Sequence, residues 1–122
     1  MKLIVVLVVG AVSTACFGCA SGGPVRADLL ARAQSAVQNA QEAGAEANAQ
    51  AADHLRVARG ELAAGRKLLI DGDQERAAPL LLRAEADAEL AMNTSREAEA
   101  IAEAKMTRDE VRSLRTSMKG GD

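Results

Sequence analysis

The sequence has almost no aromatic residues: its 122 residues include no Trp, no Tyr and a single Phe, Phe17. Sites that stack nucleic-acid bases or sugars, or that cage organic cations, need aromatic rings, so these classes of site are excluded. The formal net charge is only −2, which provides no electrostatic basis for nucleic-acid binding. A chain of this length forms at most one small domain.

Histidine is also scarce, since His54 is the only one. A metal site at His54 would need carboxylates for its other ligands, and none clusters with it in the sequence. A nucleophilic triad would depend on this one base. We therefore expect His54 to be a surface or seam-edge residue, and we predict no catalytic residue, no metal and no cofactor. The protein is expected not to be an enzyme.

The only two cysteines, Cys16 and Cys19, lie close together near the N-terminus. A disulfide between them would close a very small loop and stabilise little. They follow a positive start at Lys2 and an apolar run over residues 3–12, which is shorter than the ~20 residues that span a bilayer. A positive start, a short apolar run and a region of small residues are typical of a secretory signal peptide.

The segment Phe17-Gly18-Cys19-Ala20-Ser21 resembles a bacterial lipobox. The resemblance implies cleavage before Cys19 and acylation of its thiol, including by palmitate. The motif usually has Leu where this chain has Cys16, and acylation of Cys16 is a second interpretation. Ordinary cleavage without lipidation is a third. Several acyl chains on one cysteine give stable membrane anchoring.

The lipobox resemblance also predicts the domain boundaries and the location. Residues 1–18 would be the lipoprotein signal peptide, residues 19–25 a lipidated tether, and residues 26–119 an alanine-rich helical domain. Enteric lipoproteins that are retained at the inner membrane have Asp directly after the acylated cysteine. This chain has Ala20 at that position and so does not resemble them. We therefore expect the protein on the periplasmic face of the outer membrane.

The remainder of the chain predicts an all-α fold. It is rich in Ala, Glu, Leu, Arg and Gln, which are strong helix formers, and the whole sequence contains 27 alanines. Asn48 is a suitable N-cap, and Asp71-Gly72-Asp73 is a turn signal. These breaks predict helices over about 25–43, 48–70 and 74–118, following an N-terminal signal helix. We expect an antiparallel hairpin or three-helix bundle with a long C-terminal helix and, at Pro79, either a kink or the true helix start just before it.

Small and apolar residues recur at alternating steps of three and four in each predicted helix, which indicates coiled-coil-like heptad seams. The first seam is Leu29, Ala33, Ala36, Ala40; the second is Ala51, Leu55, Ala58, Leu62, Gly65, Leu69; the third is Ala77, Leu81, Ala84, Ala88, Ala91, Ser95, Ala98, Ala102. A turn at Gly72 predicts that residue i of the second helix lies near residue 144 − i of the third. This register places Arg59 near Glu85, and Arg56 near Asp87 and Glu89.

The rows Leu69-Ile70-Asp71-Gly72-Asp73 and Ala84-Glu85-Ala86-Asp87-Ala88-Glu89-Leu90-Ala91, behind a lipobox, resemble small alanine-rich envelope lipoproteins of Gram-negative bacteria. These are classed as a domain of unknown function, and relatives are sometimes fused to an OmpA-like peptidoglycan-binding domain. The resemblance covers roughly residues 19–104. It implies an envelope lipoprotein and carries over no activity and no catalytic residue.

The charge layout changes sign along the third predicted helix. The charged residues within 85–103 are acidic except for Arg96, and a row of cations follows on one helical face: Lys105, Arg108, Arg112, Arg115, Lys119. Beyond about residue 96 the register leaves this helix without a partner in the chain. The cations are either a solvated face that suits the negative helix end or a docking stripe for an anionic partner.

These observations predict a lipid-anchored envelope protein with a structural or protein-interaction role. The expected partners are the membrane through the N-terminal lipid, a second copy through the third helix, and an envelope protein or peptidoglycan. An antiparallel copy would set the acidic segment against the basic stripe. The alternative is a soluble periplasmic adaptor or chaperone-like helical binder.

Overall fold

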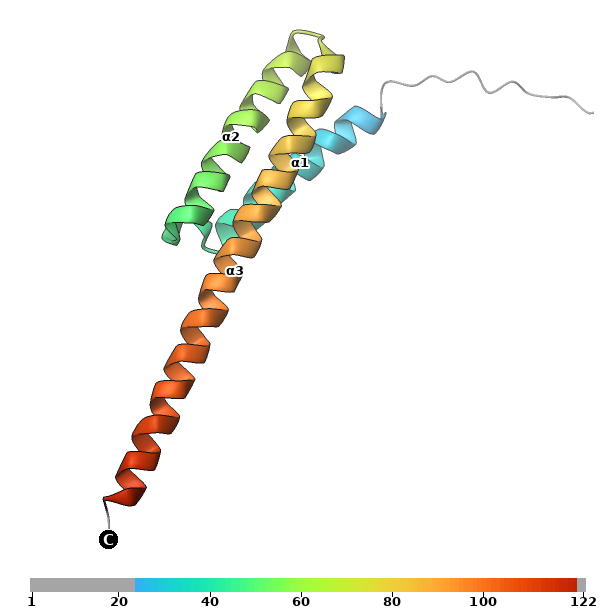
Figure 1. Ribbon diagram of the computed structural model, residues 1–122. Helices are drawn as coiled ribbons and strands as arrows, with labels where there is room; N and C mark the ends of the chain where they lie inside the picture. The colour runs from blue at the N-terminus through green and yellow to red at the C-terminus, as the bar shows by residue number, and fades with distance from the viewer. Residues whose placement is uncertain (1–23, 121–122) are drawn as a thin grey trace, which may run out of the picture.

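The computed structural model describes residues 24–120, which form three α-helices and one short 3-10 turn (Figure 1). The elements are α1 (Pro24–Glu42), η1 (Ala45–Ala47), α2 (Ala49–Ile70) and α3 (Gln74–Lys119). The predicted all-α class and long C-terminal helix are confirmed, and the helix boundaries agree within two residues. The predicted signal helix over residues 1–18 lies outside the described residues, and α1 begins within the last residues assigned to the tether.

The helix ends follow from the capping residues in the sequence. The Asn48 side chain accepts a hydrogen bond from the backbone N–H of Ala51 at 3.0 Å and begins α2. Gly72 adopts φ 81° after α2, and the N–H of Asp73 donates to the carbonyl of Leu68 at 2.8 Å. This is the left-handed glycine cap that the turn signal predicts. The Asp73 carboxylate then caps α3 by accepting from the N–H of Arg76.

Pro79 lies inside α3, which begins at Gln74. The alternative of a helix start just before Pro79 is therefore wrong. The ring removes one backbone donor from the second turn of the helix, and α3 continues through this position to Lys119. The packed seam that begins at Ala77 holds the helix on both sides of the proline.

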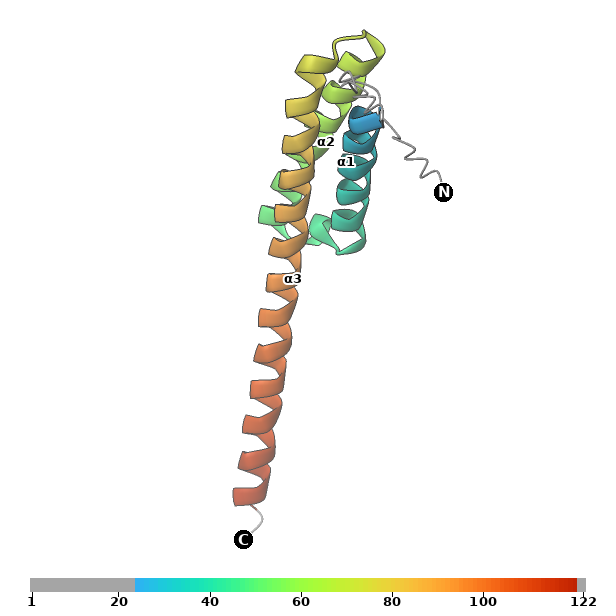
Figure 2. The same cartoon turned by 90° about the vertical axis from the view of Figure 1, so that its right-hand side faces the viewer.

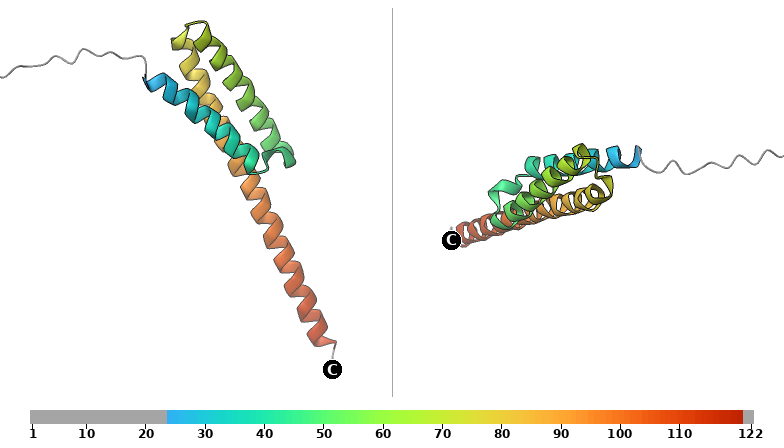
Figure 3. Two further views of the ribbon diagram at one scale, coloured as in Figure 1. Left: turned by 180° about the vertical axis from the view of Figure 1, so that it is seen from behind. Right: turned by 90° about the horizontal axis from the view of Figure 1, so that it is seen from above.

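The three helices form a bundle at one end of the molecule, and α3 continues alone beyond it (Figures 1 and 2). Helix α2 runs antiparallel to α3, and α1 packs on both, as the views from behind and above also show (Figure 3). Every residue from Glu99 to Gly120 is exposed. We call residues 99–119 the distal arm.

The core is a narrow seam of alanines with a few larger side chains. Leu55 and Leu81 are the largest fully buried side chains, each 1% exposed. The predicted seams are confirmed within the bundle, where Leu29, Ala36, Leu69 and Ala98 are partly buried, but the prediction is wrong at Ala102, which is exposed. The buried residues of α2 and α3 are Ala51, Leu55, Ala58, Leu62, Gly65, Ala77, Leu81, Ala84, Ala88, Ala91, Ser95. From α1, Ala33, Val37 and Ala40 complete the cluster. Because alanine buries little apolar area, each layer contributes modestly to stability.

The predicted register between α2 and α3 is also confirmed. Arg83 faces Glu61, with Nε 3.8 Å from Oε1, and the register places these two residues opposite one another. Gly65 lies against Leu81 and the carbonyl of Ala77 so closely that a Cβ at Gly65 would approach Leu81 Cδ2 to 2.7 Å. The missing side chain therefore allows the two helices to approach.

The ion pairs predicted from this register are wrong. Arg59 pairs with Glu46 in η1, and Arg56 pairs with Asp53 one turn earlier in α2. Glu85 instead accepts from Nη2 of Arg32 in α1 at 2.7 Å. Long arginine side chains at the edge of the seam pair with the nearest carboxylate. A register between α2 and α3 alone also omits the partners that α1 and η1 provide.

Candidate interaction surface

The basic stripe lies entirely on the distal arm, beyond the last contact of α3 with the bundle. All five of its side chains are exposed: Lys105, Arg108, Arg112, Arg115, Lys119. Arg112 forms an ion pair with Asp109 of the same helix, with Nη1 and Oδ1 3.5 Å apart. Among residues 24–120 the other four cations form no ion pair. The predicted residues are thus brought together on one surface.

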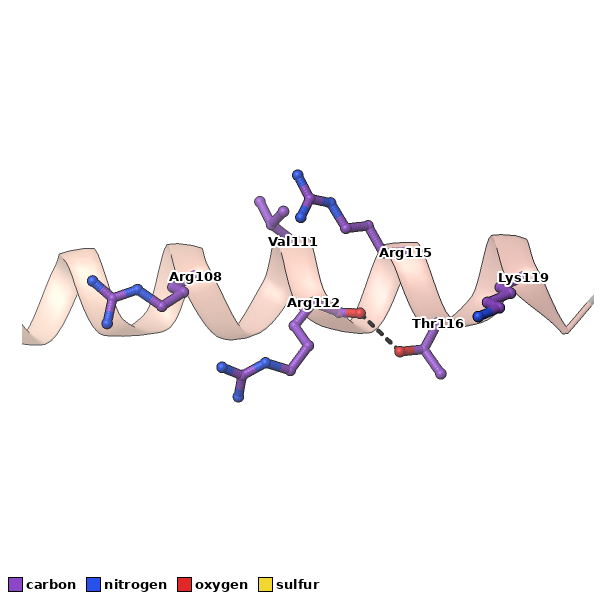
Figure 4. A pocket seen from close by; sticks show the side chains of 6 residues that line it. All are labelled: Arg108, Val111, Arg112, Arg115, Thr116 and Lys119. Carbon is purple, nitrogen blue, oxygen red and sulfur yellow. Dashed lines mark hydrogen bonds between the residues drawn. The ribbon is translucent and has the colours of Figure 1, made fainter.

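A shallow surface hollow follows the end of the distal arm and contains apolar as well as basic side chains. Arg108, Arg112, Arg115 and Lys119 line it together with Val111 and Thr116. Figure 4 shows that Arg112 projects from one edge of the helix, whereas Val111 and Arg115 project from the other. The Thr116 hydroxyl donates to the carbonyl of Arg112 at 3.0 Å and is thereby held against the backbone. The stripe therefore has two edges, and the edge with Arg115 lies beside Val111, which belongs to an apolar row of the arm.

The sequence already shows Val111, Leu114 and Met118 as apolar residues that suit a partner or a second copy, but the heptad spacing of their row was not predicted. Val111 is 42% exposed, Leu114 58% and Met118 81%. With Ala100, Ala104 and Thr107 they recur at alternating steps of four and three, which places all six on one side of the helix. The recurring step of three and four was the signal that could have revealed it.

A second arrangement that the sequence reasoning missed lies between α2 and α3 in the bundle. The Glu61 side chain is 17% exposed, and its Oε2 is buried with no hydrogen-bond partner among the described residues. Burial raises the pKa of Glu61, and the neighbouring Asp87 carboxylate raises it further, while Arg83 opposes this. Protonation of Glu61 would supply a hydrogen-bond donor to Asp87. The raised pKa links the protonation of Glu61 to folding stability.

The α1–α3 junction is fixed by two polar contacts. The buried Ser95 hydroxyl donates to the carbonyl of Ala43 at 2.6 Å, which satisfies the end of the α1 connection. Nearer the start of α1, Arg32 donates to Glu85 through both Nε and Nη2, and this contact raises the pKa of Arg32. These contacts position α1 on α3 up to Ser95, which is where the packed part of α3 ends.

The remaining predicted features hold no assembled site among the described residues. His54 is half-buried at the edge of the α2 seam. Within residues 24–120 no group of three or more His, Asp or Glu side chains is arranged to hold a metal ion. None of the helices in this range has an apolar stretch that could cross a bilayer. Cys19 and the alternative Cys16 lie outside the described residues.

Comparison with protein families gives one match, to the domain of unknown function DUF4398 over residues 28–107. The chain belongs to this family. The match to DUF4398 covers the whole bundle from the first turns of α1 and extends into the first half of the distal arm. No curated protein and no solved structure matches the chain.

Proposed function

We propose that this DUF4398 protein is an outer-membrane lipoprotein, anchored through Cys19, with a structural or protein-interaction role in the cell envelope. The observation that carries the proposal is the segment Gly18-Cys19-Ala20-Ser21 behind a short apolar run. Acylation of one cysteine with several chains is sufficient for stable anchoring. No catalysis is part of the proposal.

The shape of the molecule supports an anchored arm. Helix α1 begins at the same end of the bundle as the Gly72 turn, and the distal arm leaves from the opposite end (Figures 1 and 2). A tether entering at α1 would therefore hold the Gly72 end toward the membrane. The 46 residues of α3 extend about 69 Å at 1.5 Å per residue. The arm would project into the periplasm, away from its lipid.

The distal arm is the surface proposed to serve this role. Its cations are exposed, and four of the five have no ion-pair partner within residues 24–120. They suit an anionic envelope protein or the peptidoglycan, and the resemblance to relatives fused to OmpA-like domains is compatible with a position near the cell wall. A helix stretch that has no packing partner of its own gains stability when it binds one.

Metabolic labelling with palmitate in a Gram-negative host tests the anchor directly. The wild type should be labelled and should remain with outer membranes after a salt wash. Cys19→Ala should be unlabelled and appear in the soluble periplasmic fraction, whereas the matched Cys16→Ala variant should behave as the wild type. Membrane retention of Cys19→Ala after the salt wash contradicts the proposal. An unlabelled wild type in the soluble fraction would instead favour the periplasmic adaptor.

A further inference from the structure

The apolar row of α3 changes sides where the bundle ends. Up to Ser95 the buried residues face α1 and α2. Continued into the arm, the same helical face carries Ala102 and Met106 and then the polar residues Asp109, Ser113 and Thr116. The larger apolar residues Val111 and Leu114 lie about half a turn away, given 3.6 residues per turn. The second half of α3 is therefore patterned for a partner on the side opposite the bundle.

This row has the spacing of a heptad seam. In the notation a to g, Ala104, Val111 and Met118 take position a, and Ala100, Thr107 and Leu114 take position d. The closing layers pair a β-branched valine at a with leucine at d, a combination that favours two strands. Ile101 falls at the border of the seam and Met106 away from it. Val111, Leu114 and Met118 are the side chains that a second strand would cover.

The charges beside the seam are complementary to a second copy of the same chain. Arg108 and Arg115 occupy the e positions, and Glu103 and Glu110 occupy the g positions. In a parallel pair a g residue faces the e residue five positions later on the other strand. Glu103 then faces Arg108, and Glu110 faces Arg115, twice in each dimer. Among residues 24–120 none of these four side chains has an ion-pair partner.

The e and g positions of these charges disfavour an antiparallel dimer, although the acidic segment 85–103 and the basic stripe would attract one another in that orientation. Antiparallel strands bring e against e and g against g, so Arg108 and Arg115 would face arginines of the other copy. In that antiparallel pairing, Val111 and Leu114 would meet the outer face of α3 next to the bundle, where Glu89, Asn93 and Glu97 surround the partly exposed Leu90. Charge and apolar pattern agree only in the parallel orientation.

We infer that residues 100–118 form a short parallel two-stranded coiled coil with a second copy of this protein. The seam begins at Ala100, beyond Ser95, which is the last buried residue of α3 in the bundle. The inference rests on the proposed role of the distal arm as an interaction surface and names its partner. It separates the basic stripe into two groups. Arg108 and Arg115 flank the seam, whereas Lys105, Arg112 and Lys119 lie at b and remain in solvent.

Charge exchange in the full chain tests this assignment by sedimentation over a range of concentrations. The wild type should convert from monomer to dimer as its concentration rises. Arg108→Glu with Arg115→Glu should weaken the dimer at least about tenfold, because four attractive pairs become repulsive. Adding Glu103→Arg and Glu110→Arg should restore it. The matched reversal Arg112→Glu with Lys119→Glu should leave the dimer unchanged.

Disulfide trapping tests the orientation. In a chain with Cys16 and Cys19 replaced by serine, Leu114→Cys should form a symmetric disulfide on mild oxidation, while Asp109→Cys, at the outward f position, should not. A wild type that stays monomeric at every concentration overturns the inference, as does equal weakening by both pairs of reversals. Absence of the Leu114→Cys disulfide in a dimeric sample overturns the parallel orientation. Acylation at Cys19 is measured separately, so none of these results bears on the anchor.

Discussion

The two halves of α3 belong to one continuous helix and differ in what supports them. Residues 74–98 bury one alanine-rich side against α1 and α2, and residues 99–119 are exposed all round. Helices gain most of their stability from packing an apolar side, and an isolated stretch of this length is marginal in water. Both halves therefore have the composition of a helix, but only the first half is stabilised by neighbouring helices.

The two halves of α3 also differ in the direction of their apolar residues. In the first half the buried residues point toward the chain's own helices, although Leu82 and Leu90 are 48% and 46% exposed, and in the second half Val111 and Leu114 point away from those helices. A helix that is surrounded by solvent gains nothing from placing its apolar residues on one side, so such a row is typical of a helix that packs against a partner. The arm is therefore built for a contact that the bundle does not supply.

The largest expected difference between the halves concerns truncation of a seam residue. Leu55→Ala should lower the free energy of unfolding by about 2–5 kcal/mol, because Leu55 is fully buried between the helices. The matched Val111→Ala in the arm should change it by less than about 0.5 kcal/mol at concentrations where the protein is monomeric. Urea unfolding followed by circular dichroism measures both. Equal losses would mean that the two halves are packed alike.

A pair of glycines in α2 separates close packing from helix propensity. A Cβ at Gly65 would lie 2.7 Å from Leu81 Cδ2, whereas at Gly60 no atom lies within 4 Å. Gly60→Ala should stabilise the protein by about 0.5–1 kcal/mol. Gly65→Ala should destabilise it by about 1–2 kcal/mol, since overpacking outweighs the same gain in propensity. Thermal melts of the two variants should move in opposite directions, and a shift of both upward would mean that the seam is loose at Gly65.

The boundary between the halves can be tested at Ser95. Its hydroxyl is buried and donates to the carbonyl of Ala43. Ser95→Ala should cost about 1 kcal/mol, because this carbonyl loses its partner. Ser113→Ala in the arm should have no measurable effect on unfolding. If Ser95→Ala is also silent in urea unfolding, solvent satisfies the Ala43 carbonyl and the packed region ends earlier than Ser95.

The smallest effect concerns the pH dependence of stability. Because the folded state raises the pKa of Glu61 above its value of 4.5 in the unfolded chain, folding favours the protonated carboxyl. Stability is therefore lost as the pH rises from about 4.5 through the folded pKa. Glu61→Gln should be more stable than the wild type at pH 7 and similar to it below pH 4. The exposed Glu103→Gln should leave the profile unchanged, and identical profiles for all three proteins would contradict the raised pKa.

The seams, the Asn48 and Asp73 caps and the Gly72 turn could be predicted because they depend on local spacing and on backbone geometry. The arginine ion pairs could not, since a flexible guanidinium such as that of Arg59 selects the nearest carboxylate in three dimensions. The Glu61–Asp87 contact depends on how deeply one side chain is buried, which the register does not specify.

The basic stripe was predicted in full as a group of residues. Its division into two borders was not, because that division depends on the apolar row beside it. Alanine and threonine at Ala100, Ala104 and Thr107 carry a weak hydrophobic signal, and the charges of the stripe are more conspicuous. The acylated cysteine is a prediction from the motif alone and lies outside the described residues.

Amide hydrogen exchange, measured at several protein concentrations, tests whether the distal arm is held only by a second copy of the chain. Local protection reports which segments are held by packing. Amides of residues 29–95 should exchange slowly at every concentration, while those of residues 100–118 should exchange rapidly in dilute protein and become protected as the concentration rises. Protection of residues 100–118 that is already equal to the bundle in dilute protein, or that never appears at any concentration, would contradict the account.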